Sequence, residues 1–114
     1  MDRSGETSGV SRYLCSELIV LRREGAETVV NLEEIWIEGA AVEMDEPLAA
    51  GLAVELQCGE HLFTATVARA EKHELGCRIE LEFSRETPWD PAVYKPTHLM
   101  NPADLPGENR SGAN

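Results

Sequence analysis

The sequence predicts an all-β domain, a six-stranded antiparallel barrel that ends in a short C-terminal helical turn. Three observations lead to this fold class. Apolar and polar residues alternate with a period of two in several short segments, which is typical of half-buried strands. Short connections that contain glycine join most of these segments, as they do in β-hairpins. The chain has 114 residues, which is enough for one domain with a single core.

The clearest strand is Cys77–Phe83, in which four apolar residues share one face while Arg78, Glu80 and Glu82 occupy the other. A run of β-branched and apolar residues at Leu18–Leu21 favours a strand over a helix. The remaining predicted strands are Thr28–Val30, Ala41–Met44, Val54–Cys58 and Phe63–Arg69.

Turn residues separate these strands at regular places. Gly25 lies between the first two strands, Gly59 between the fourth and fifth, and Gly76 between the fifth and sixth. Pro47 and Gly51 mark a longer loop after the third strand. A meander of hairpins of this kind closes most simply into a small barrel.

The two ends of the chain differ in composition from the middle. Residues 1–11 are rich in Ser, Gly and charge and predict a flexible arm, while residues 101–114 predict a disordered tail. The barrel domain is expected at residues 12–100. Near its end, Asp90 is a helix-capping residue and Pro91 suits the first helical position, so we expect one or two helical turns there.

The charge balance excludes some classes of partner. The chain has 10 basic and 21 acidic residues, a net charge of −11, and a surface that binds nucleic acid needs clustered Lys and Arg. We therefore expect no nucleic-acid partner and no membrane insertion. Three cysteines, without a CxxC motif or a signal sequence, predict reduced thiols and a cytoplasmic protein.

The sequence predicts neither an enzyme nor a metal centre. No nucleophile, phosphate-loop or zinc-protease motif is present. Cys58 and His61 have a CxxH spacing, but a metal site needs further ligands nearby, so buried thiols are expected instead. Glu33 and Glu34 are neighbours on an expected strand and should point to opposite faces, which would keep them from one substrate atom.

Taken together, the chain resembles the PilZ family from about residue 12 to residue 102. An Arg and an aromatic residue precede the first strand, a glycine-ended segment follows the first hairpin, and a proline-bearing loop and a Gly-Cys strand come later. The segments that carry the resemblance are Arg12-Tyr13, Glu34–Ala40, Asp45–Leu48 and Glu74–Phe83.

The resemblance implies a ligand, the bacterial second messenger cyclic di-GMP. The family binds it through an RxxxR motif before the first strand and a [DN]xSxxG motif after the first hairpin. Guanidinium groups suit this chemistry because they form bidentate bonds to phosphates and guanine edges and also stack on bases. No other cofactor is expected.

The first motif is incomplete in this chain. If Arg12 is the second Arg of RxxxR, the first position falls on Ser8; if it is the first, the second falls on Ser16. Arg12 is still a candidate phosphate contact, and Arg3 and Arg22-Arg23 are further candidates for a phosphate-binding cluster.

Of the three defined positions in the second motif, the chain retains only the glycine. Glu34 stands at the Asp position, Trp36 at the Ser position and Gly39 at the Gly position. Glu is longer than Asp and Trp is far larger than Ser, so a pocket shaped for the dinucleotide would have to rearrange. Trp36 is also a candidate protein contact, because Trp is enriched at interface hot spots, with packing on the barrel as the alternative.

Three hypotheses follow. The first is a PilZ-like regulatory adaptor that acts by protein–protein contact, with weak or lost cyclic di-GMP binding and a partner not yet identified. The second is a functional cyclic di-GMP receptor that uses Arg12 and the Glu34–Gly39 turn. The third is a structural barrel of an unrelated family.

Overall fold

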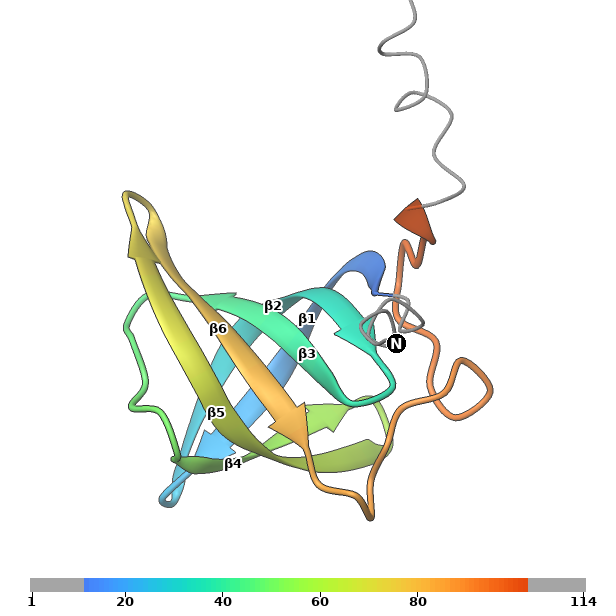
Figure 1. Cartoon of the computed structure of the whole chain (residues 1–114), viewed down its shortest axis with the longest axis horizontal. Coiled ribbons are helices and arrows are strands. Elements are labelled where there is room, and N and C mark those ends of the chain that lie inside the picture. Colours follow the sequence, from blue (N-terminus) through green and yellow to red (C-terminus); the bar gives the residue numbers. More distant parts are fainter. Residues whose placement is uncertain (1–11, 103–114) are drawn as a thin grey trace, which may run out of the picture.

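The computed structural model describes residues 12–102 and shows them as an antiparallel barrel (Figure 1). Its strands are β1 (Tyr13–Arg23), β2 (Ala26–Trp36), β3 (Gly39–Met44), β4 (Ala53–Cys58), β5 (His61–His73) and β6 (Gly76–Phe83). They are hydrogen-bonded in the order β1-β2-β3-β6-β5-β4, and β4 returns to β1 at Val20–Arg22. The predicted all-β, six-stranded barrel is confirmed.

The predicted flexible arm, residues 1–11, lies outside the described residues. The predicted tail, residues 101–114, also lies outside them except for its first two residues. Both therefore stay predictions.

The β1–β2 hairpin shows how a short sequence signal sets a turn. Arg23 pairs with Ala26, so Glu24 and Gly25 form a two-residue loop. Their φ angles are 47° and 81°, and a loop with both central residues in the left-handed region has the twist that suits a hairpin. Gly25 adopts this conformation without strain because it has no Cβ.

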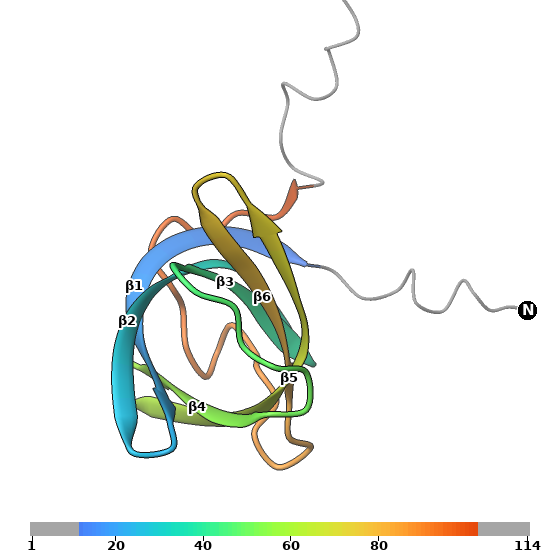
Figure 2. The same cartoon turned by 90° about the vertical axis from the view of Figure 1, so that its left-hand side faces the viewer.

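All six strands are longer than predicted, and the extensions of β2 and β5 have different reasons. In β2 the register with β3 shifts between Leu32 and Glu34, and this bulge interrupts the alternation of inward and outward side chains that would have marked the end of the strand. In β5 the residues from Ala68 to His73 are exposed. They pair with β6 as a hairpin that projects beyond the barrel (Figures 1 and 2), so neither face needs an apolar pattern.

The C-terminal segment packs on the barrel after β6. Trp89 is 1 % exposed within the core cluster, and its Nε1 donates to the Tyr94 carbonyl oxygen at 2.8 Å. The segment then runs beside the start of β1, where Leu14 and Met100 form a β-bridge. The C-terminal segment thus joins the end of the barrel domain to its beginning.

The predicted helical turn is a single turn. The Ala92 amide donates to Asp90 Oδ1 at 2.8 Å, and the Tyr94 amide donates to the Asp90 carbonyl at 3.2 Å. Asp90 therefore caps the turn as predicted. No α-helix forms among residues 12–102.

Candidate functional site

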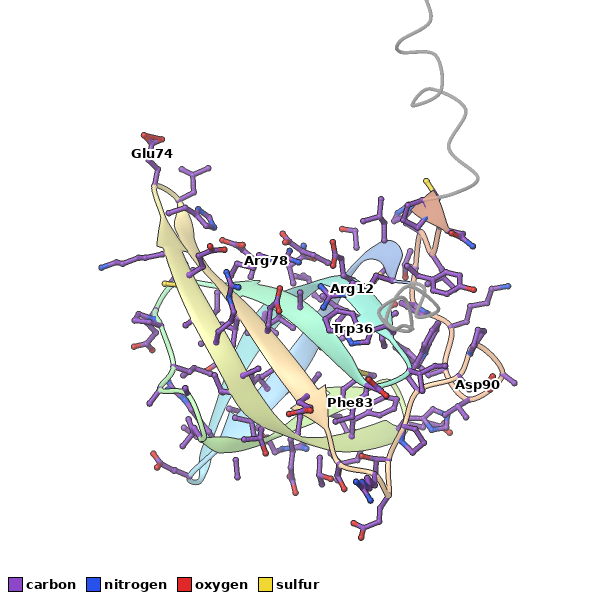
Figure 3. All side chains as sticks on the ribbon, viewed as in Figure 1. Arg12, Trp36, Glu74, Arg78, Phe83 and Asp90 are labelled. Carbon is purple, nitrogen blue, oxygen red and sulfur yellow. The ribbon has the colours of Figure 1, made fainter. Side chains whose placement is uncertain are left out.

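Trp36 lies on the outer face of the barrel, at the end of β2. Its neighbour Ile35 is in the core cluster, and residues that alternate along a strand point to opposite faces. Yet Trp36 is 7 % exposed. The Arg12 guanidinium covers it, with Cζ 3.8 Å from the centre of the indole ring (Figure 3). The sequence left the direction of this side chain open, and the structure shows an outward indole covered by a cation.

Two carboxylates from different strands lie near the Arg12 guanidinium. Its Nη1 lies 3.7 Å from Glu34 Oε1 on β2 and 3.7 Å from Glu80 Oε2 on β6. The side chain of Arg12 is 46 % exposed, so each pair contributes little by itself. Stacking on the indole and the two carboxylates together fix where the guanidinium lies.

A second guanidinium, that of Arg78 on β6, joins the same network. Its Nη2 lies 3.1 Å from Glu34 Oε1 and 3.8 Å from Glu80 Oε2, and its Nη1 lies 3.5 Å from Glu33 Oε1. Glu33 and Glu34 thus meet one guanidinium. The prediction that they point apart was wrong, because the bulge in β2 breaks the alternation at this point.

Gly39 opens β3 directly opposite Trp36. A Cβ at this position would press against the Leu81 carbonyl oxygen and lie 3.0 Å from Cζ2 of the indole. The glycine is therefore needed for space, since it lets β2, β3 and β6 approach each other beneath the indole. We define the Trp36 cluster as Arg12, Glu34, Trp36, Gly39, Arg78 and Glu80.

The hollow at the Trp36 cluster is small and acidic. Its volume is about 200 Å³. Arg12 is the cation in its lining, against the three carboxylates Glu38, Glu80 and Glu82. Pockets for small molecules usually measure about 300–1,000 Å³. The hollow is therefore below the usual size for a dinucleotide, and its charge repels an anion.

The structure brings together the four residues that the sequence selected, Arg12, Glu34, Trp36 and Gly39. It adds Arg78 and Glu80, which the sequence analysis placed on the outer face of a strand without assigning them to the site. Their positions depend on the pairing of β3 with β6, where Ala41 lies opposite Glu80 and Glu43 opposite Arg78. A pairing register between distant strands has no local sequence signal.

The other arginines do not extend the site. Arg22 and Arg23 lie at the far end of β1 from Arg12. Arg22 Nε donates to Glu27 Oε2 at 2.8 Å, and Arg23 Nη2 donates to Glu46 Oε2 at 3.2 Å. The hypothesis that they form one phosphate-binding cluster with Arg12 is wrong, because strand β1 separates them. Arg3 lies outside the described residues.

Two of the three thiols, those of Cys15 and Cys58, are held in the protonated form. Cys58 and Cys77 are buried, as predicted. Burial, followed by the carboxylates of Glu17, Glu34 and Glu33, raises the pKa of Cys15 from about 9 to about 12. Burial raises the pKa of Cys58 to about 12 as well. The thiolate is the form of cysteine that acts as a nucleophile or binds a metal. Cys15 and Cys58 are therefore poor candidates for a nucleophile or a metal ligand at neutral pH.

Within residues 12–102, no group of three or more His, Cys, Asp or Glu side chains is arranged to hold a metal ion. Over the same range, no helix has the length and apolar character that would be needed to cross a bilayer. Comparison with known proteins gave no matching family model and no matching curated protein.

Proposed function

We propose that the chain is a PilZ-like regulatory adaptor domain of the bacterial cytoplasm, which acts by protein–protein contact and has weak or lost cyclic di-GMP binding. The barrel fold supports the family assignment. So does the gathering of Arg12, Glu34, Trp36 and Gly39 on one outer surface, because the family resemblance assigns the ligand to these positions.

One observation carries the adaptor proposal. The surviving arginine of the motif stacks on the indole that replaces the motif's serine, and Glu34 and Glu80 hold it there. A dianionic ligand would have to displace these contacts. It would also have to enter a surface where Arg12 and Arg78 already face carboxylates, and burying a phosphate beside unpaired carboxylates is costly.

The receptor alternative has one observation in its favour. The Arg12 side chain is 46 % exposed, so part of its guanidinium faces solvent above the indole. A guanine could stack there, since guanidinium groups stack on flat rings. This contact would supply one cation for two phosphates, which is why the adaptor is the better-supported function.

Calorimetric titration with cyclic di-GMP separates the two functions. We expect no heat and no shift in melting temperature with ligand at about 300 µM, a concentration that would saturate a receptor with a Kd of about 1 µM. Arg12→Ala should behave like the wild type. A clear melting shift that disappears in Arg12→Ala would establish the receptor and end the adaptor proposal.

The protein contact itself is tested by affinity capture from the native cytosol. Trp36 remains the interaction candidate from the sequence, but its indole is 7 % exposed, so a partner would reach it only if Arg12 moved. We therefore expect Trp36→Phe, which keeps an aromatic ring under Arg12, to retain the same partners as the wild type. Loss of every partner in this variant, with the melting temperature unchanged, would place the contact at the indole itself.

A further inference from the structure

A groove separates β2 from the tip of the β5–β6 hairpin on the outside of the barrel. Its volume is about 310 Å³. Three of its side chains are apolar and strongly exposed: Leu18 at 71 %, Val29 at 63 % and Leu75 at 87 %. They come from β1, β2 and the hairpin tip, three separate elements. Exposed apolar residues that converge in this way are typical of a binding surface. We call it the Leu75 groove.

The wall of the groove is anchored to the barrel. Nε2 of His73 lies 2.7 Å from Oε2 of Glu43, which joins the end of β5 to β3. Gly76 packs so closely on β3 that a Cβ there would lie 2.8 Å from the Met44 carbonyl oxygen. The tip that carries Leu75 is therefore positioned before any partner arrives, which lowers the entropic cost of binding.

The floor of the groove includes an unpaired strand edge. β2 pairs with β1 along its length as far as Ala26, but its pairing with β3 begins at Asn31. Among the described residues, no strand lies on the other side of residues 26–30. Thr28, Val29 and Val30 line the groove. An open edge of this kind accepts an extended peptide as an added strand.

The charge of the groove selects the partner. Its lining contains the carboxylates Glu43, Asp45 and Glu46 and no Lys or Arg. Arg23 pairs with Glu46 and His73 contacts Glu43, while the Asp45 carboxylate has no ion-pair partner among residues 12–102. A second copy of this chain, which also carries a net charge of −11, is repelled. A basic segment is attracted.

We propose that the Leu75 groove binds an extended basic segment of a partner protein, added as a strand along residues 26–30 of β2. Aliphatic side chains of the segment pack on Leu18, Val29 and Leu75, and its Lys or Arg side chains face Glu43, Asp45 and Glu46. This inference rests on the proposed adaptor function and locates its contact surface away from the Trp36 cluster.

Selection from a phage-displayed library of random 12-residue peptides against the full chain tests the inference. We expect enriched peptides to carry net positive charge with aliphatic residues at alternating positions. A fluorescent copy of an enriched peptide should bind Leu75→Ser and Asp45→Lys about tenfold more weakly than the wild type. Absence of enrichment, enrichment of acidic peptides, or equal binding to these variants would overturn the proposal.

Two matched controls exclude general effects. Leu62→Ser removes a leucine that is 43 % exposed and lies outside the groove, and Glu60→Lys reverses an exposed charge in the β4–β5 loop. Both variants should bind the peptide as the wild type does. Equal weakening by the controls would show that the groove is not the site.

Hydrogen exchange and sedimentation identify the occupant. The bound peptide should slow amide exchange at residues 26–30. A concentration-dependent dimer that Leu75→Ser dissolves would instead make a second copy the occupant. Groove amide shifts that move in Arg110→Glu without peptide would make the chain's own end the occupant. Either result overturns the proposal.

The outcomes for the two proposals are separable. If cyclic di-GMP does not bind and the groove selects no peptide, the adaptor function is retained, but the assignment of its protein contact to the Leu75 groove is wrong. If cyclic di-GMP binds tightly, the adaptor function is wrong whatever the groove does.

Discussion

The Trp36 cluster and the Leu75 groove lie on the same outer surface of the barrel but differ in how their apolar groups are satisfied. The Trp36 indole is 7 % exposed because Arg12 covers it, whereas Leu75 is 87 % exposed. Judged by residue type, Trp is the better interaction residue. Judged by its contacts, Trp36 already has its partner within the chain, and Leu75 does not. The difference teaches that intramolecular contacts decide which surface is open to another molecule.

The same contrast divides stability from binding. Groups that pack within the chain stabilise the fold, and groups left exposed contribute little to it. Variants in the Trp36 cluster should therefore change the free energy of unfolding, and variants in the Leu75 groove should change binding alone.

The largest change in the free energy of unfolding is expected for Trp36→Ala. Removing a nearly buried indole, with the Arg12 stack that covers it, should lower the free energy of unfolding by about 3 kcal/mol. Leu75→Ala, at an exposed position, should change it by less than about 0.5 kcal/mol. Urea denaturation measures both. Equal effects of the two variants would contradict the division.

The second-largest loss in the free energy of unfolding is expected for Gly39→Ala. The added methyl group would press on the Leu81 carbonyl oxygen and on the Trp36 ring, so the strands must shift apart. Overpacking of this kind costs about 1–3 kcal/mol. Gly59→Ala, where a Cβ would meet no atom within 4 Å, controls for space, although its φ of 62° adds some backbone strain. A Gly39→Ala variant as stable as the wild type would show that the strands do not pack this closely.

A smaller effect is expected from the Arg12–Trp36 stack itself. A double-mutant cycle of Arg12→Ala and Trp36→Leu should give a coupling free energy of about 0.5–1 kcal/mol, the usual range for an exposed cation–π pair. Arg22→Ala, at the far end of β1, should show no coupling to Trp36→Leu. Independent effects of Arg12 and Trp36 would mean that the guanidinium does not cover the indole in solution.

The smallest effect near neutral pH concerns Cys15. Its pKa is raised to about 12 by burial first and then by Glu17, Glu34 and Glu33. The native state therefore holds this proton more tightly than the unfolded state, so the stabilisation is complete below pH 9 and is lost as pH rises from about 9 toward about 12.

Peptide mapping of iodoacetamide alkylation checks the cause of this shift. Because Glu34 contributes to it, Glu34→Gln should lower the pKa of Cys15 and speed its alkylation at pH 9. Asp45→Asn, in the Leu75 groove, should leave the rate unchanged. Rapid alkylation of wild-type Cys15 at pH 7 would contradict the assigned environment.

The sequence predicted the parts of the molecule that depend on local patterns. Cys77–Phe83 alternates regularly and forms most of β6, and Gly25 lies in the connection between β1 and β2, where a turn was predicted. Leu18 shows where a local pattern fails. It belongs to the apolar run Leu18–Leu21 but points outward, while Ile19 and Leu21 are buried. A strand that is apolar on both faces does not reveal which side will be covered.

The site was predictable only in part for a related reason. Arg12, Glu34, Trp36 and Gly39 were selected by their positions in a family motif. Arg78 joins Glu33 and Glu34 through the pairing of β3 with β6, which are distant in the sequence, and through the bulge in β2, which the sequence analysis did not predict. The cover over Trp36 likewise depends on Arg12, just before β1, packing on the end of β2, which composition and spacing do not show.

The most direct test of the account is to reopen the Trp36 cluster. The triple variant Ser8→Arg, Glu34→Asp, Trp36→Ser restores both family motifs and removes the indole that Arg12 covers. A control with Ser11→Arg in place of Ser8→Arg adds the same charge at the wrong spacing. In parallel calorimetric titrations with cyclic di-GMP, we expect no heat from the wild type or the control and one-site binding by the triple variant. Tight binding by the wild type, abolished by Arg12→Ala, would contradict the claim that the chain's own side chains close this site.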